Sequence, residues 1–491
     1  MIALRYRLWT ALGIVLVCVP GTWAQQQNQD ESQSQDQSQP QDQSQTPIPA
    51  YHSPFASAAD NSNTDNANTG PQSLAPDTQP LAGAQSLSLG VPESRSYWQP
   101  AASVSSTAAS NGLGASNGWT TYTTLLGGLN LHDIAGRSDL ALSYLGGGLI
   151  SNDGAIGNGV IQELGLDEKL SWRRATLSFI DEGSYLPEAG FGYGGVGGLA
   201  LPGGSPVLLQ PGLLPSATIL TTRNQQFDNS FLTEIDTRLS PRSSLTFMGG
   251  YSLLRFLGTN LLNMNDTIFQ AGYNHDLTRK DTIAVLYRFN AFRFGNSGQS
   301  INDNIAQLSY ARRVTGRVAF QIAAGPEFTF FGTPVLTGSV STNSTATSSL
   351  TTWSLSTSLT YQWRQSQLGL SYAHGVSGGA GVFAGAIGDT VTGSLSHQMT
   401  RTFDATITTG YAKNNALAIP GFAIINQSYS YWFAGASLSH PWGRTMNLFL
   451  SYQAQYQNSN FEFCAGPTCG TSLIIHLISV GLNWQGRPIA F

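Results

Sequence analysis

Charged residues and long apolar runs are both scarce in this sequence, and each shortage excludes a class of protein. Asp, Glu, Lys and Arg make up only 10% of the 491 residues, and the formal net charge is −5. Without a basic cluster, nucleic-acid binding has no support. Beyond the N-terminus no segment has the eighteen or so consecutive apolar residues that a membrane-spanning helix needs. A helical membrane protein is therefore excluded, whereas a membrane β-barrel is not.

The N-terminus has the pattern of a secretory signal peptide. Arg5 and Arg7 precede an apolar run at residues 8–19, and Thr-Trp-Ala at residues 22–24 stands before a Gln-rich segment. The apolar run is too short to span a bilayer comfortably. We expect residues 1–24 to be removed on export, and Cys18 with them.

Residues 25–117 have a composition typical of disorder. A Gln/Ser/Asp tract is followed by a stretch rich in Pro, Ala, Ser, Asn and Gly, and eight acids face the single base Arg95. Too few apolar residues are present to offset the entropy of ordering the chain. We predict a disordered periplasmic arm, in which Tyr97 and Trp98 are either a docking point or a stray aromatic pair.

Residues 351–372 predict a membrane β-hairpin. Trp353, Leu355, Leu359 and other apolar or aromatic residues alternate with a row of Ser, Thr and Gln, as expected for a strand between lipid and water. A short polar turn at residues 364–366 returns the chain into a second apolar row. A soluble β-sandwich shows the same alternation, so the prediction depends on its repetition.

The pattern recurs from residue 119 onward in runs of about ten to thirteen residues, the length of a tilted transmembrane strand. Very short turns alternate with long connections, and basic residues lie beside the short turns. The long connections are residues 257–265, 295–303, 331–350, 375–388, 412–427 and 458–471. We predict an all-β fold, a transmembrane antiparallel β-barrel of about 16 to 18 strands over residues 118–491.

The strand count depends on residues 120–131. Counting back from the C-terminus gives sixteen strands if the first begins near residue 139. The segment 120–131 would then run towards the periplasmic side, and no earlier strand would carry the chain to the outer side where this segment starts. Either an earlier strand lies within the arm, which gives eighteen strands, or the segment lies inside the lumen.

The C-terminal residues 484–491, WQGRPIAF, resemble the C-terminal signal of bacterial outer-membrane β-barrel proteins. Gly486, Ile489 and Phe491 match that signal, whereas Trp484 stands where a polar residue is usual. Pro488 lacks an N–H donor, which favours a barrel seam or a short extension. The resemblance implies outer-membrane localisation, contact with lipid and lipopolysaccharide, and assembly by the barrel-assembly machinery. It implies no particular activity and leaves the oligomeric state open.

Two connections carry distinctive residues. The longest, residues 187–229, is rich in Gly, Pro and Leu, and we predict that it folds into the barrel as a constriction or packs on a partner. Cys464 and Cys469 flank a Gly-Pro turn and predict a loop disulfide in an exported protein. His476 is the only further ligand nearby, so the sequence predicts no metal site and no cofactor.

Charges on the polar rows predict the chemistry of the lumen. The alternation directs both acids and bases inward, namely Glu163, Asp167, Lys169, Glu234, Asp236, Arg238, Arg288, Glu327 and Asp404. A wall of mixed sign favours passive, porin-like diffusion of small hydrophilic solutes with weak charge selectivity. The alternative is a closed barrel whose charges pair across the lumen and whose loops serve as an adhesion or assembly platform.

Matches to catalytic motifs are weak. The GxGxxG match at residues 190–195 lacks a βαβ unit around it. The GxSxG match at residues 375–379 lacks the strand-turn-helix setting of a nucleophile elbow. Outer-membrane enzymes use Ser, His and acidic residues at the outer rim, so His374, Ser377 and Asp389 are the residues a catalytic barrel would need. We predict that the protein is not an enzyme.

Overall fold

The computed structural model describes most of the chain after residue 95. The described residues are 96–110, 118–151, 158–186, 225–257, 262–295, 299–315, 317–337, 340–363, 365–378, 384–400, 402–417, 427–460 and 472–491. In this part of the chain no helix is long and apolar enough to cross a membrane.

The described residues form one antiparallel sheet of eighteen long strands and one very short strand. In chain order the strands are β1 (Tyr97–Ser110), β2 (Trp119–Ala135), β3 (Ser138–Ser151), β4 (Gly159–Ser171), β5 (Ala175–Leu186), β6 (Gln225–Ser240), β7 (Ser243–Leu257), β8 (Met264–Asp276), β9 (Asp281–Phe294), β10 (Ser300–Arg313), β11 (Val318–Thr337), β12 (Val340–Gln362), β13 (Ser366–Ser377), β14 (Ala386–Gln398), β15 (Asp404–Ala416), β16 (Ser428–Trp442), β17 (Met446–Ser459), β18 (Ser472–Gln485) and β19 (Ile489–Ala490).

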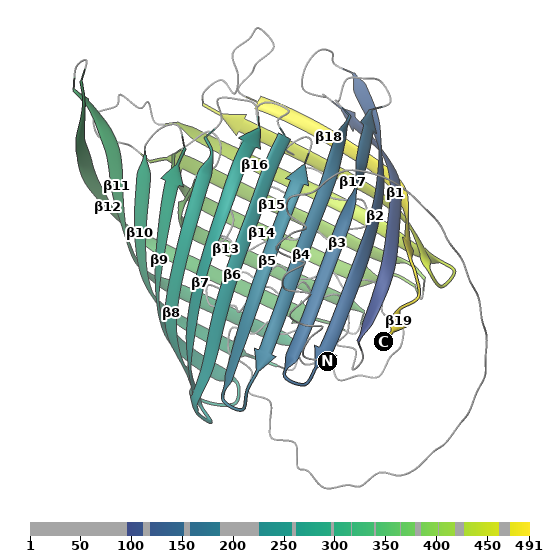
Figure 1. The fold of residues 1–491 in the computed structure, drawn as a ribbon, viewed down its shortest axis with the longest axis horizontal. Helices are drawn as coiled ribbons and strands as arrows, with labels where there is room; N and C mark the ends of the chain where they lie inside the picture. Colours follow the sequence, from purple (N-terminus) through teal and green to yellow (C-terminus); the bar gives the residue numbers. More distant parts are fainter. Residues whose placement is uncertain are drawn as a thin grey trace, which may run out of the picture. The chain divides into compact units, whose positions relative to one another are not determined.

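Each strand pairs with its neighbours in sequence, and the sheet closes on itself. β1 pairs with β2 on one side and with β18 on the other, so the wall has no free edge (Figure 1). β19 extends the line of β18 and pairs with the first two residues of β1. Closure satisfies the backbone donors and acceptors that an open sheet would leave unpaired in lipid. The predicted all-β barrel is confirmed, and of the two strand counts the larger is correct.

The outer surface of the barrel is apolar. Large exposed side chains recur at every second position, for example Phe269 and Tyr273 on β8, and Ile478 and Val480 on β18. Their neighbours on the other row are mostly polar and buried, such as Gln270 and Asn274. Apolar residues outside and polar residues inside are the arrangement of a barrel surrounded by lipid. The chain is therefore a transmembrane barrel with the architecture of bacterial outer-membrane proteins.

The two ends of the barrel differ in the length of their connections. At one end, here the short-turn end, strands are joined by a few residues, and Gly136 and Gly443 take the positive φ values of 64° and 82° that such tight turns require. At the other, the long-loop end, the connections are generally longer. In outer-membrane barrels the short turns face the periplasm.

One predicted long connection is wrong. Residues 331–350 form most of an extended hairpin, because β11 continues to Thr337 and β12 begins at Val340. The pair projects beyond the neighbouring strands (Figure 1). A register shift between Pro334 and Leu336 interrupts their pairing. Polar residues occupy both rows here, so the alternation that reveals a lipid-facing strand is absent although the backbone pairing continues.

The predicted boundary between arm and barrel at residue 118 is also wrong. β1 lies at Tyr97–Ser110, inside the range assigned to the arm, and it is the missing partner of β2. Tyr97 packs edge-on against the His132 ring with centroids 5.6 Å apart, so it is part of the wall. The predicted signal peptide and the rest of the predicted arm lie outside the described residues.

Candidate channel lumen

The nine charged residues predicted to line a pore occupy inward positions on five strands. Side chains two residues apart on a strand point to the same face. Glu163 lies two residues from the buried Ile161, and Glu327 lies two residues from the buried Thr329. The residues are Glu163, Asp167 and Lys169 on β4, Glu234, Asp236 and Arg238 on β6, Arg288 on β9, Glu327 on β11 and Asp404 on β15. Whether they line a conducting path stays a prediction.

Carboxylates gather on the wall formed by β3 to β6. The Ser184 hydroxyl donates to Asp228 Oδ1 at 2.5 Å, and the Thr246 hydroxyl donates to Asp236 Oδ1 at 3.2 Å. Glu163 interacts electrostatically with Asp228. Hydroxyl donors thus satisfy part of the acceptor capacity, as buried charged groups require.

A second set of charges lies on β8 to β11. Asp266, Arg288, Asp303 and Glu327 come from four successive strands, and we call them the acidic cluster. Arg288 and Glu327 both stand opposite Ile305 in register, and Arg288 interacts electrostatically with Asp303 and Glu327. The Thr329 hydroxyl donates to Asp303 Oδ1 at 2.9 Å. The acidic cluster contains three carboxyl groups and one guanidinium.

Apolar side chains lie on the same wall nearer the long-loop end. This mouth cluster consists of Met264, Phe292, Phe294, Ile301, Phe331, Val376 and Leu417. Val376 is in β13 and Leu417 directly follows β15, so these strand ends bend inward over the face of β8 to β11. A Cβ on Gly385, whose φ is 91°, would lie only 2.2 Å from Ile301 Cδ1. We call residues 376–378 and 384–387, together with Leu417, the inward segment, and its close packing covers the inner face of β8 to β11 at the long-loop end.

A hydrogen bond joins the two clusters. Val376 N donates to Glu327 Oε1 at 3.0 Å across the intervening strand β12. Ser354 on β12 accepts from Gln307 Nε2 at 3.0 Å. The inward segment is therefore held both by apolar packing and by a buried carboxyl group.

The residues that a catalytic barrel would need are only partly brought together. His374 Nδ1 and Asp389 Oδ1 are 2.8 Å apart, and Trp353 stacks on the His374 ring with centroids 4.0 Å apart. The Ser377 hydroxyl instead donates to Ala386 O at 3.4 Å. His374 Nε2 is buried without a hydrogen-bond partner in the described part of the chain. A Ser-His-acid relay is thus not assembled among these three residues.

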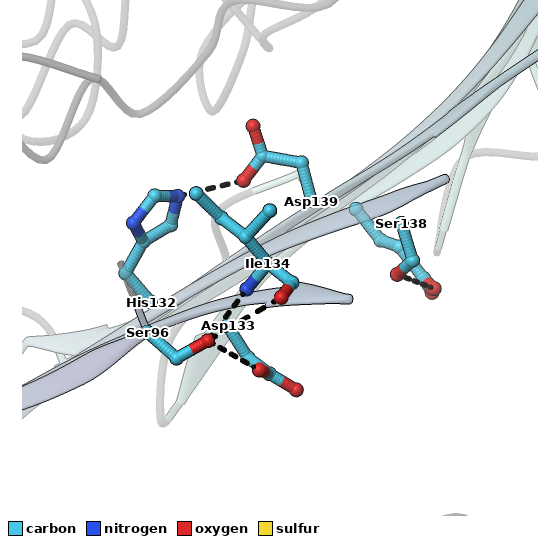
Figure 2. A network of polar contacts seen from close by, with 7 residues as sticks. Ser96, His132, Asp133, Ile134, Ser138 and Asp139 are labelled. Carbon is cyan, nitrogen blue, oxygen red and sulfur yellow. Dashed lines mark hydrogen bonds and ion pairs between the residues drawn. The ribbon is translucent and has the colours of Figure 1, made fainter. Parts of the chain in front are cut away.

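Polar contacts fasten the first strands together at the short-turn end (Figure 2). Ser96 donates its hydroxyl to Asp133 Oδ1 at 2.8 Å and accepts from Ile134 N at 3.0 Å. His132 Nε2 and Asp139 Oδ1 are 2.6 Å apart and join β2 to β3. These contacts lie beside the place where the barrel closes, because Ser96 directly precedes β1, which pairs with β18 and β19.

The C-terminal residues lie at this seam. Gly486 N donates to Pro100 O at 2.8 Å, and Phe491 N donates to Ser96 O at 3.3 Å. Ile489 pairs with Trp98, and Pro488 separates β18 from β19. Of the two predicted positions for this end, the barrel seam is correct. The role of Gly486, Ile489 and Phe491 as an assembly signal stays a prediction.

Several inward acids were missed from the sequence for one reason. Asp228 and Asp303 fall within the predicted connections 187–229 and 295–303, and Asp266 directly follows the predicted connection 257–265. Polar residues occupy both rows there, so the alternation gave these acids no direction. Only the backbone pairing reveals that their strands continue. The predicted constriction over residues 187–229 lies outside the described residues up to residue 224, as do Cys464 and Cys469.

Comparison with known proteins gives similarity of structure alone. The chain matches no model of a protein family and no curated protein. Among solved structures it is similar to the outer membrane protein OpdK from Pseudomonas aeruginosa, with 9% identity, a TM-score of 0.40, and coverage of 79% of this chain and 99% of that one. OpdQ from the same organism has 11% identity, a TM-score of 0.40, and coverage of 80% and 98%. OccAB3 from Acinetobacter baumannii has 10% identity, a TM-score of 0.41, and coverage of 79% and 99%.

Proposed function

We propose that the protein is a porin-like channel for passive diffusion of small hydrophilic solutes across the outer membrane. The observation that carries this proposal is the closed wall of eighteen strands whose inner face is polar and charged. Barrels with so many strands enclose more space than their own inward side chains need, whereas eight strands enclose a space that side chains fill.

The wall supports a weak preference for cations. Inward acids outnumber inward bases in the described strands, yet Lys169, Arg238 and Arg288 lie among them. Mixed signs moderate the potential that a permeating ion meets, so the channel is a weak filter.

One observation favours the alternative, a non-conducting surface platform. Several inward polar side chains are fully buried, and the mouth cluster closes over part of the wall. A platform would use such packing to hold its loops in place. Conductance separates the two functions, because a platform gives none.

The experiment is single-channel recording of the refolded mature chain in a planar bilayer. Current steps that are proportional to voltage support the channel. In a salt gradient, the reversal potential should shift slightly from zero towards the equilibrium potential of the cation. Deletion of residues 194–215 tests the predicted constriction and should enlarge the steps, whereas shortening residues 419–425 is a matched control. Silence of a folded protein before and after deletion would leave the platform as the function.

A further inference from the structure

Two arginines lie close together on the outer surface of the barrel near the long-loop end. Arg255 on β7 shares the outward row of the exposed Tyr251, and Arg293 on β9 shares that of the exposed Tyr287. Asn265 on β8, the strand between them, stands directly opposite Arg293 in register. Neighbouring strands are about 4.8 Å apart, so the backbones of β7 and β9 are about 10 Å apart. We call Arg255 and Arg293 the outer arginine pair.

Hydrogen bonds fix the guanidinium group of Arg255 against the wall. Its Nη1 donates to Leu254 O and to Met264 O, each at 3.0 Å. Its Nη2 donates to Asn265 Oδ1. The group therefore lies across the gap between β7 and β8 in one orientation, rather than sampling many rotamers as a solvent-exposed arginine does.

Arg293 repeats this arrangement on the next two strands. Its Nη1 donates to Phe292 O at 2.9 Å and to Ile301 O at 3.2 Å. Its Nη2 donates to Asn302 Oδ1 at 2.8 Å. Among the described residues, Nε–H and one N–H of Nη2 are the donors that these bonds leave on each guanidinium. Donors on one edge of a guanidinium match two oxygens of the same anion.

The outer arginine pair has no acid beside it. The acids nearest in sequence, Asp266 and Asp303, are buried on the inner row, and no carboxylate in the described ranges forms an ion pair with either arginine. The connections next to the pair, residues 258–263 and 295–299, contain no Asp or Glu. Like charges on neighbouring strands of one face repel each other. An anion from outside the chain would remove that repulsion.

The opposite end of the same wall shows the usual arrangement. Arg312, at the short-turn end of β10, has Asp281 of β9 3.5 Å from its Nε. An acid of the chain thus neutralises an outer arginine at the short-turn end, whereas the outer arginine pair is left without one.

The position of the outer arginine pair determines which anion is available. Phe330, which is 49% exposed, stands opposite Asn302 in register, and Tyr287 lies deeper on the outer face of β9. Exposed aromatic residues form girdles at the membrane interfaces of outer-membrane barrels, and the long loops face outward. The pair is therefore at the level of the head groups of the outer leaflet. A phosphate on a head group presents the oxygens that each guanidinium edge requires.

We propose that the outer arginine pair binds an outer-leaflet lipid whose head group carries two phosphates, one for each guanidinium, while the acyl chains pack against Phe330 and Tyr287. The proposal depends on the transmembrane barrel and not on conduction. Met264, Phe292 and Ile301, whose carbonyls the arginines bond, belong to the mouth cluster. A bound lipid would therefore hold from outside the strand ends that carry the mouth cluster inside.

The test is native mass spectrometry of the mature protein, purified from membranes and delipidated in detergent, with bisphosphorylated lipid A. Lipid A with one phosphate removed, phosphatidylglycerol and inorganic phosphate are the comparison ligands. The variants are Arg255→Gln and Arg293→Gln, which remove the charge and keep an N–H donor. Arg279→Gln is the matched control, because Arg279 is an exposed arginine in the short turn between β8 and β9, at the opposite end of these strands.

Saturable binding of bisphosphorylated lipid A supports the site if Arg255→Gln and Arg293→Gln each weaken it about tenfold or more and Arg279→Gln does not. The factor corresponds to the loss of hydrogen bonds between charged groups. Lipid A with one phosphate should bind more weakly to the parent protein.

Three results would overturn the proposal. They are unchanged binding in both variants, equal binding of phosphatidylglycerol, and displacement of the lipid by an equal concentration of inorganic phosphate. Each variant must retain the β-sheet circular dichroism of the parent, and either one suffices if the other does not fold.

Lipid binding and conduction fail separately. A protein that binds the lipid through these arginines but gives no current in a bilayer refutes the channel and retains the site. A protein that conducts while both variants bind the lipid like the parent retains the channel and refutes the site.

Discussion

Replacing Gly325 with alanine should destabilise the barrel, because β10 passes too close for a side chain at that position. A Cβ on Gly325 would lie 1.8 Å from Ala306 O and 2.9 Å from Gln307 Cα, whereas real Cβ atoms essentially never approach other heavy atoms within 3.0 Å. The obstacle is backbone, which cannot rotate away as a side chain does. The pairing of β10 with β11 also skips Ala306 and Gln307, beside Pro326, so the ladder is already interrupted at this close approach.

The magnitude follows from comparison with Gly249 on β7. A Cβ there meets nothing within 4 Å. Alanine at Gly249 should stabilise the fold by about 0.5–1 kcal/mol, since glycine within a strand carries that entropic cost. Alanine at Gly325 gains the same entropy but forces two backbones apart, which costs about 1–3 kcal/mol or more. The two variants should therefore differ in unfolding free energy by about 1–3 kcal/mol.

Urea unfolding of both variants in lipid vesicles, followed by tryptophan fluorescence, measures this difference. Equal stability of Gly325→Ala and Gly249→Ala would refute the close approach of β10 and β11. It would also weaken the geometry of the acidic cluster, because Glu327 is only two residues from Gly325 on the same row.

Three further predictions test other parts of the barrel. Val480→Arg on the outer surface should lower the unfolding free energy by about 2–4 kcal/mol, whereas Ser394→Arg on the inner row should lower it much less. Urea unfolding in lipid vesicles measures both, and equal losses would contradict the assignment of the two faces. Phe491→Ala should reduce the fraction of folded barrel in cells while leaving refolding of the purified chain nearly unchanged, and parallel losses in both assays would refute a role in assembly. Alkylation of the exported protein should leave Cys464 and Cys469 unmodified until a reductant is added, and modification without reductant would rule out the disulfide.

Most of the fold could be predicted because lipid makes one row of each strand apolar. In residues 351–372 Trp353 is 51% exposed and Ser354 is buried, as the alternation predicts. The rule fails where small residues occupy both rows of a strand in the wall. In β1 small residues such as Ala, Ser and Thr occupy both rows, so its composition resembles that of a linker and only its hydrogen bonds to β2 and β18 identify it.

The candidate site was predicted only in part, for a related reason. The sequence neighbours of Arg288 and of Glu327 are apolar or aromatic and face outward, so the alternation predicts that these two charged side chains face inward. Asp266 and Asp303 lie beside other polar residues at strand ends, where the alternation is lost. Nor does any local pattern show that Val376 folds back to bond Glu327, because that contact joins strands separated by β12.

Glu327 fixes the inward segment through one oxygen, because Oε1 accepts from Val376 N at 3.0 Å. Glutamine at this position keeps a side-chain oxygen for Val376 N, whereas alanine removes it. Glu327→Ala should therefore release the inward segment, while Glu327→Gln should leave it in place.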